Sequence, residues 1–132
     1  MTLVDTSMWV GALRVGGALD LDRWVPFDEI VTCLPVIQEV LQGFRREDEY
    51  RYGLRALGAL PIVESPVEKS LFLEAVDLYR RVRRVGLTVR SSLDCLIAAC
   101  ALRHDLVVLH DDRDYGALAR VSQLRERNVR EM

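Results

Sequence analysis

The sequence LVVLHDDRD, residues 106–114, joins an uninterrupted apolar run to a cluster of acidic residues. The run, residues 106–109, contains two valines and shows no alternation of apolar and polar side chains, which is typical of a strand buried in a parallel sheet. Ligands of open α/β sheets bind outside the carboxyl ends of the strands. The stretch therefore predicts a parallel sheet with acidic side chains at its ligand-binding end.

Three other short apolar runs, Thr2–Val4, residues 30–31 and Ile62–Val63, are further strand candidates. Segments with apolar residues at helical spacing separate them. We expect helices near Ser7, from Pro35 through residue 44, over residues 45–60, from Pro66 to a stop at Gly86, and after residues 91–92. Strands that alternate with helices in this way predict an α/β sandwich.

The 132 residues are half hydrophobic, which predicts one domain, residues 1–132, with a core of its own. The net charge of −2 excludes a protein that binds nucleic acid through bulk positive charge. No apolar run is long enough to span a bilayer, and the N-terminus lacks the features of a signal peptide. Three cysteines without metal-binding spacing indicate reduced thiols, so we expect a cytoplasmic protein.

Acidic residues recur where the predicted elements converge. Asp5 ends the first strand, Glu39 lies off the apolar stripe of its helix, and Asp94 falls in the first turn of another. A further three, Asp111, Asp112 and Asp114, follow the 106–109 strand. Magnesium and manganese prefer oxygen ligands, and a carboxylate site that holds them can activate water and shield the charge on a phosphodiester.

Each acid also has a purely structural explanation. Asp5 could cap the first helix, Asp94 could pair with Ser91 as a helix cap, and Glu39 could be solvated. The acids after residue 110 could form an ordinary acidic loop. As a group they favour a metal site, because closely spaced like charges repel one another unless solvent or a cation neutralises them.

Other chemistries fit less well. His104 and His110 have no zinc-like spacing with an acid or thiol, so both are interpreted as structural or surface residues. A calcium loop starting at Asp112 would need glycine where Ala117 stands. A phosphatase with Asp-x-Asp after the first strand would need an acid in place of Ser7.

Four segments, residues 3–9, 36–43, 92–99 and 108–115, resemble the four motifs of PIN-domain ribonucleases in order and spacing. The compact length resembles VapC, the toxin of VapBC toxin–antitoxin pairs. This resemblance implies a three-layer α/β/α sandwich with a short, mainly parallel central sheet. It also implies an endoribonuclease that depends on one or two Mg²⁺ or Mn²⁺ ions and cuts transfer, ribosomal or messenger RNA to inhibit translation.

Carried over by position, the resemblance assigns catalysis and metal binding to four acids and a further metal ligand to a fifth. The catalytic acids are Asp5, Glu39, Asp94 and Asp112, and the additional ligand is Asp114. Thr6 and Ser7 stand where a hydroxyl can support the first acid, whereas the role of Asp111 is open. The family further implies a VapB-like antitoxin and a homodimer as partners.

Several alternatives stay open. The fold could be kept for binding without catalysis, or the chain could be a DNA-directed nuclease of the flap or repair type, although such chains are usually longer. Four arginines at positions 80, 81, 83 and 84 could face RNA or form the solvated side of a helix. Large apolar residues could line a groove for the antitoxin, stack on bases or belong to the core: Trp9, Leu13, Trp24 and Phe44.

Overall fold

The computed structural model describes residues 1–13 and 21–132, and its centre is a five-stranded sheet. The strands are β1 (Thr2–Val4), β2 (Ile30–Cys33), β3 (Ile62–Val63), β4 (Val107–His110) and β5 (Arg125–Asn128). They lie in the order β3-β2-β1-β4-β5, and each of these pairings is parallel. The four predicted strands are confirmed as β1 to β4.

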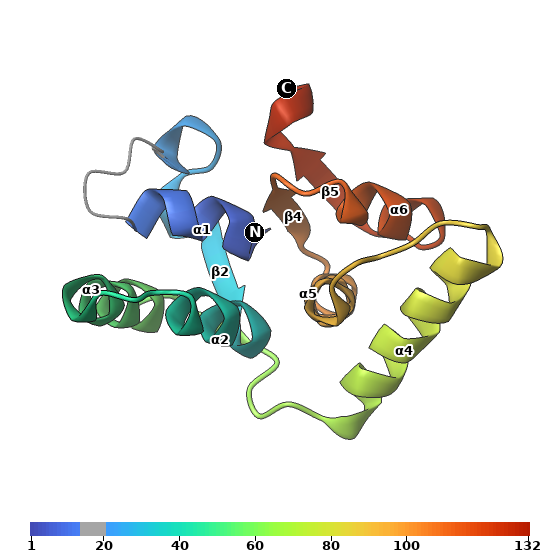
Figure 1. The fold of residues 1–132 in the computed structure, drawn as a ribbon, viewed down its shortest axis with the longest axis horizontal. Helices are drawn as coiled ribbons and strands as arrows, with labels where there is room; N and C mark the ends of the chain where they lie inside the picture. Colours follow the sequence, from blue (N-terminus) through green and yellow to red (C-terminus); the bar gives the residue numbers. More distant parts are fainter. Residues whose placement is uncertain (14–20) are drawn as a thin grey trace.

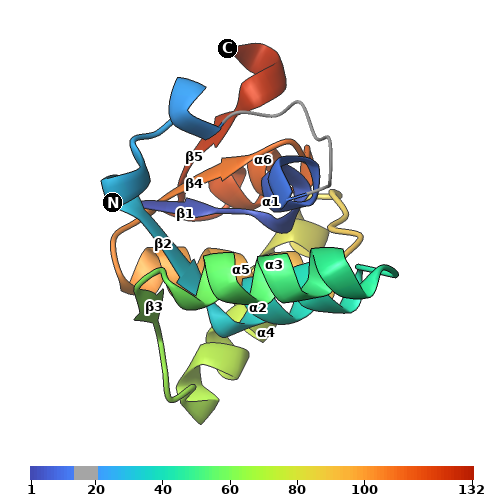
Figure 2. The same cartoon turned by 90° about the vertical axis from the view of Figure 1, so that its left-hand side faces the viewer.

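Helices cover both faces of the sheet. They are α1 (Thr6–Leu13), α2 (Leu34–Gln42), α3 (Glu47–Gly58), α4 (Lys69–Arg84), α5 (Ser92–Arg103) and α6 (Asp114–Arg120). Figure 1 shows α1, α2 and α3 on one side of the strands and α4, α5 and α6 on the other. Figure 2 turns the first of these layers toward the reader, with the strands behind it running from β5 at the top to β3 below. The expected three-layer α/β/α sandwich is thus confirmed.

Two elements were not expected from the sequence. The β5 strand has the sequence Arg-Glu-Arg-Asn, without an apolar residue, and pairs with β4 at the edge of the sheet. The short α6 helix begins at Asp114, where an acidic loop was one alternative. The predicted helix from Pro66 was wrong in its first turn, because the residue before α4, Glu68, is still extended and the helix starts at Lys69.

The core lies between the sheet and the two helical layers. The central strands contribute fully buried side chains, such as Leu3 and Leu109. The α5 helix is buried on more than one side, because it contacts both β4 and α4, and small residues such as Ala98 and Ala99 permit this close approach. The cysteines are free and buried, as expected for reduced thiols. In the residues described, no helix is both long and apolar enough to cross a membrane.

Candidate active site

The strand register brings the acids to one edge of the sheet. Val4 of β1 pairs with Leu109 of β4, and the amide of Asp5 donates to the carbonyl of Leu109 at 2.9 Å. The chain after β1 and the acidic segment after β4 therefore leave the sheet side by side. The α2 helix begins directly after β2 at the same edge and carries Glu39, while the first turn of α5 carries Asp94.

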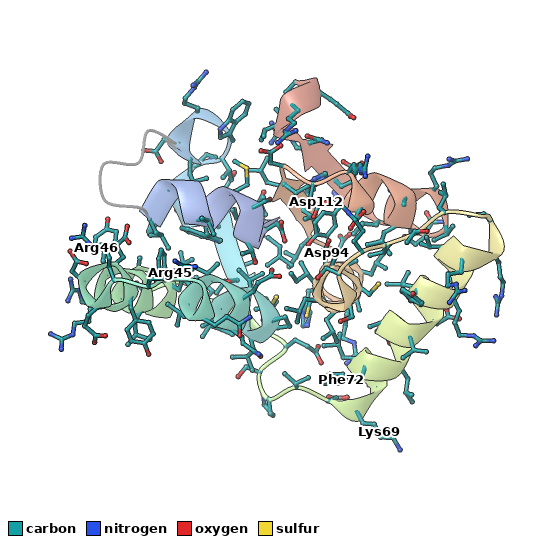
Figure 3. All side chains as sticks on the ribbon, in the orientation of Figure 1. Arg45, Arg46, Lys69, Phe72, Asp94 and Asp112 are labelled. Atoms are coloured by element: carbon teal, nitrogen blue, oxygen red, sulfur yellow. The ribbon has the colours of Figure 1, made fainter. Side chains whose placement is uncertain are left out.

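The structure brings all five predicted site residues together. They form two groups of three acids, Asp5 with Glu39 and Asp94, and Asp94 with Asp112 and Asp114. Within each group, one carboxylate oxygen of each residue lies within 4.8 Å of the others. Figure 3 shows Asp94 on α5 next to Asp112 from the segment after β4, near the centre of the molecule. Because Asp94 belongs to both groups, the five residues form one cluster, called the acid cluster below.

Burial differs across the acid cluster. The side chains of Asp5, Asp94 and Asp114 are almost inaccessible, with 2%, 3% and 3% of their residue surface exposed. Glu39 and Asp112 are partly exposed. The acid cluster is therefore closed toward the core and open to solvent on the side of Glu39 and Asp112.

Asp5 is held by donors on both carboxylate oxygens. Its Oδ2 accepts from the amide and the hydroxyl of Ser7, at 3.1 and 2.7 Å. Its Oδ1 accepts from the hydroxyl of Tyr115 at 2.6 Å. The Ser7 hydroxyl in turn accepts from the amide of Asp111 at 3.0 Å and so joins α1 to the segment after β4. Ser7 thus supports the first acid as expected, whereas the buried hydroxyl of Thr6 finds no partner among the described residues.

Tyr115 is a site residue whose role the sequence did not reveal. It is fully buried on α6, and its hydroxyl lies 3.4 Å from Oδ1 of Asp94 as well as close to Asp5. Burial, followed by the charges of Asp5 and Asp94, raises the pKa of the phenol well above its usual value. The hydroxyl therefore keeps its proton and acts as a donor to the acid cluster. A tyrosine after three acids reads equally well as a core residue, so no sequence signal distinguishes the two roles.

Asp94 differs from the other acids of the cluster in having a buried carboxylate oxygen without a partner among the described residues. Its Oδ2 is buried and has no hydrogen-bond partner in the described part of the chain. Burial raises the pKa of Asp94 from 3.8 to about 8, and the charges of Asp5 and Asp112 add to this effect. Helix capping does not explain the residue, since its side chain bonds no backbone amide and Ser91 makes no side-chain cap. A cation beside Oδ2 would relieve both the repulsion and the missing partner.

Arg90 orders the acids that follow β4. Its amide donates to Oδ2 of Asp114 at 3.0 Å, and its guanidinium lies 3.7 Å from both Asp112 and Asp114. The amide of Asp114 donates to Oδ1 of Asp112 at 3.0 Å. These contacts fix two acids relative to one another while leaving other carboxylate oxygens available.

The histidines have structural roles, as interpreted from the sequence. Nδ1 of the buried His110 accepts from the amide of Asp112 at 3.1 Å, so Nε2 carries the proton and donates to Glu126 at 3.1 Å. His104 contacts Glu64 at 2.8 Å, outside the acid cluster. Asp111 also stays outside both groups and pairs with Arg130.

The acid cluster fits a hard divalent cation. Its donors are all carboxylate oxygens, and magnesium and manganese favour oxygen ligands. Asp94 presents a buried oxygen without a partner and a raised pKa, which is the condition that a bound cation would correct. The two overlapping groups could hold one ion or two, with Asp94 as the shared ligand.

Of the three roles left open for the large apolar residues, the structure favours the core for two of the four. Trp9 and Leu13 are only 4% and 5% exposed and belong to the core, and the Trp9 indole donates to the carbonyl of Val4 at 3.1 Å. Neither residue is available to stack on a base or to contact a partner. Trp24 and Phe44 are partly buried against the same core. The apolar residues of α1 thus point into the sandwich, because α1 packs against the sheet.

The chain is similar to known proteins in both sequence and structure. The model of the PIN domain matches residues 2–122. Ribonuclease VapC11 of Mycobacterium tuberculosis is 35% identical over 136 residues, which cover 98% of this chain and all of VapC11. Ribonuclease VapC6 of the same organism is 33% identical over 100 residues, 74% of this chain and 78% of VapC6. A chain in the crystal structure of VapBC2 from Rickettsia felis, bound to a DNA fragment from the promoter, superposes with a TM-score of 0.74 at 16% identity, covering 96% of this chain and 97% of that one.

Proposed function

Because this chain belongs to the PIN-domain family and, within it, to the VapC ribonucleases, we propose that it hydrolyses RNA at the acid cluster as the toxin of a VapBC-type pair. The observation that carries the proposal is the convergence of Asp5, Glu39, Asp94 and Asp112, which come from four separate segments of the chain. Structural roles for the single acids give no reason for them to meet. With Asp114 they make the site that we assign to Mg²⁺ or Mn²⁺.

The residues of the site divide the work. When bound, the cation stabilises the charge that develops on the phosphate and lowers the pKa of water. Asp5 presents a fixed carboxylate because Ser7 and Tyr115 hold its two oxygens. Asp94 supplies the unpartnered oxygen at the centre of the cluster. This preorganisation lowers the cost of arranging the ligands during the reaction.

Glu39 and Asp112 occupy the open side of the acid cluster, where RNA and water enter. Among the described residues the Glu39 carboxylate makes no hydrogen bond or ion pair, so it is free to orient the attacking water and accept its proton. Water then attacks a backbone phosphate and leaves a 3′-hydroxyl and a 5′-phosphate. We assign the substrate to transfer, ribosomal or messenger RNA, as the resemblance implies.

The partners and organisation follow the same family. We propose a VapB-like antitoxin, a homodimer and a cytoplasmic location. The whole chain, residues 1–132, is proposed to be a single PIN domain. The β5 strand supports this extent, because it lies beyond the matched residues 2–122 and still pairs with β4 at the edge of the sheet.

A fold kept only for binding is the main competing function. The curated relatives are ribonucleases, and all four proposed catalytic acids are present, so this alternative is not favoured. A binding protein also has no use for a buried carboxylate such as Asp94 with an unpartnered oxygen.

A cleavage assay tests the proposal. Purified protein is incubated with total cellular RNA and with single-stranded DNA, in EDTA, Mg²⁺ or Mn²⁺. We expect RNA cleavage with either cation, none in EDTA, and a loss of at least about 100-fold in Asp94→Asn. Asp28→Asn is the matched control, because Asp28 is exposed just before β2, at the amino end of the sheet. Full cleavage in EDTA or by Asp94→Asn would refute the assigned site, and cleavage of DNA alone would favour the repair-type alternative.

A further inference from the structure

Two hollows lie beside the acid cluster, and arginines form much of their walls. The first, of about 410 Å³, is lined by Asp111 and Asp112 together with Arg90, Arg113 and Arg130. The second, of about 520 Å³, is lined by Asp114 together with Arg90, Arg113 and Arg120. Arg90 and Arg113 line both hollows and so stand between them. A strand of RNA lying on the acid cluster would meet these side chains as it leaves.

The arginines differ in whether their guanidinium groups already lie beside an acidic side chain. Arg90 lies 3.7 Å from both Asp112 and Asp114, and Arg130 pairs with Asp111. Arg113 and Arg120 are exposed, and across residues 1–13 and 21–132 neither guanidinium group makes a hydrogen bond or an ion pair. Two guanidinium groups that face one hollow and lack protein partners are available to a ligand with negative charge.

The accessible wall of the second hollow is positively charged, although Asp114 also lines it. Asp114 is 3% exposed, and Arg90 covers it with both an amide hydrogen bond and its guanidinium. The positive groups of Arg113 and Arg120 therefore dominate the accessible wall. Guanidinium groups pair readily with phosphate oxygens, often through two parallel hydrogen bonds.

We propose that the second hollow is a subsite for a backbone phosphate next to the one that is cut, and that Arg113 and Arg120 bind it. The inference rests on the proposed function, since it places an RNA strand on the acid cluster. It identifies where a chain with a net charge of −2 finds positive charge for its substrate. The arginines of α4 are a weaker candidate, because the hollow lined by Arg80, Arg83 and Arg84 includes none of the five acids.

Binding of a short, fluorescein-labelled single-stranded RNA of mixed sequence tests the subsite. Fluorescence anisotropy is measured with the full chain carrying Asp94→Asn, so that the probe is not cut. Arg113→Gln and Arg120→Gln are added to this parent one at a time. Arg55→Gln is the matched control, since Arg55, like Arg120, is an exposed arginine in the last turn of a helix but lies on α3, across the sheet (Figure 1).

We expect each subsite variant to raise the Kd about 3- to 10-fold at about 50 mM salt. The slope of log Kd against log salt should fall by about 0.7 for each lost phosphate contact. Arg113→Lys should keep that slope, because it keeps the charge. Arg55→Gln should leave both the Kd and the slope unchanged.

The subsite is wrong if both glutamine variants bind like the parent, if Arg55→Gln weakens binding equally, or if the parent does not bind the probe. Wild-type cleavage in Mn²⁺, measured in parallel, separates this outcome from the proposed function. RNA cleavage with unchanged binding of the glutamine variants rejects the subsite alone. Weakened binding without any wild-type cleavage supports the subsite and rejects the nuclease.

Discussion

Replacing Asp94 with asparagine should stabilise the metal-free protein while removing its activity. The pKa of Asp94 rises from 3.8 to about 8 in the folded chain, chiefly because the residue is buried and also because Asp5 and Asp112 lie beside it. A shift of that size corresponds to at most about 6 kcal/mol of destabilisation when the group is ionised. The amide of asparagine is still a buried polar group, so the gain should be smaller, about 2–3 kcal/mol.

The effect has a defined pH window. The folded pKa lies above the unfolded one, so the folded state binds a proton more tightly and rising pH destabilises the wild type between about pH 4 and about pH 8. The advantage of Asp94→Asn should therefore be small near the lower limit and reach its full value above the upper one. Asparagine does not titrate, so the variant lacks this part of the pH dependence.

Urea unfolding in EDTA across this pH range measures the difference. Asp28→Asn removes an exposed acid outside the cluster and should change the free energy of unfolding by less than about 0.5 kcal/mol. If Asp94→Asn is less stable than the wild type at high pH, or if its advantage does not grow with pH, then repulsion and burial at Asp94 do not act as described.

Three further outcomes follow from the contacts of the site and the core. Mn²⁺ at about 100 times its Kd should stabilise the wild type by about 2.7 kcal/mol and leave the stability of Asp94→Asn unchanged. Thermal unfolding measures both, and equal shifts in the two proteins would place the ion outside the acid cluster. Tyr115→Phe removes the 2.6 Å hydrogen bond to Asp5 and should lower kcat about 10-fold, whereas Tyr52→Phe, at an exposed position, should leave kcat unchanged. Equal kcat values for the two variants would show that the Tyr115 hydroxyl does not support Asp5 in the reaction. Leu109→Ala empties a fully buried position in β4 and should cost about 2–5 kcal/mol in urea unfolding, and a loss below about 1 kcal/mol would argue against a packed central strand.

The central strands were predictable because their apolar sequence matches their buried position in the sheet. Residues 106–109 are apolar throughout, and the structure buries most of β4 between α1 of one layer and α5 of the other. The acids could be placed because parallel strands end together, so that Asp5 and Asp112 follow neighbouring strands at one edge. Local pattern and global position agree at these residues.

The remaining features depend on contacts between distant residues. The charged strand β5 exists because β4 offers it a free edge, a condition that its own four residues do not express. The same holds for Trp9, whose burial is decided by the elements around α1. Tyr115 and Arg90 gain their roles from hydrogen bonds across 110 and 24 residues of sequence, respectively. The spacing of residues along the chain does not predict such long-range hydrogen bonds.

The most direct test of the metal-dependent nuclease centre is anomalous diffraction from crystals of the protein soaked in Mn²⁺. We expect a manganese peak within coordination distance of Oδ2 of Asp94, shared with Asp5 and Glu39 or with Asp112 and Asp114. The peak should be absent from Asp94→Asn crystals treated in the same way. Manganese bound only away from the acid cluster, or an acid cluster that stays empty at saturating Mn²⁺, would contradict this expectation.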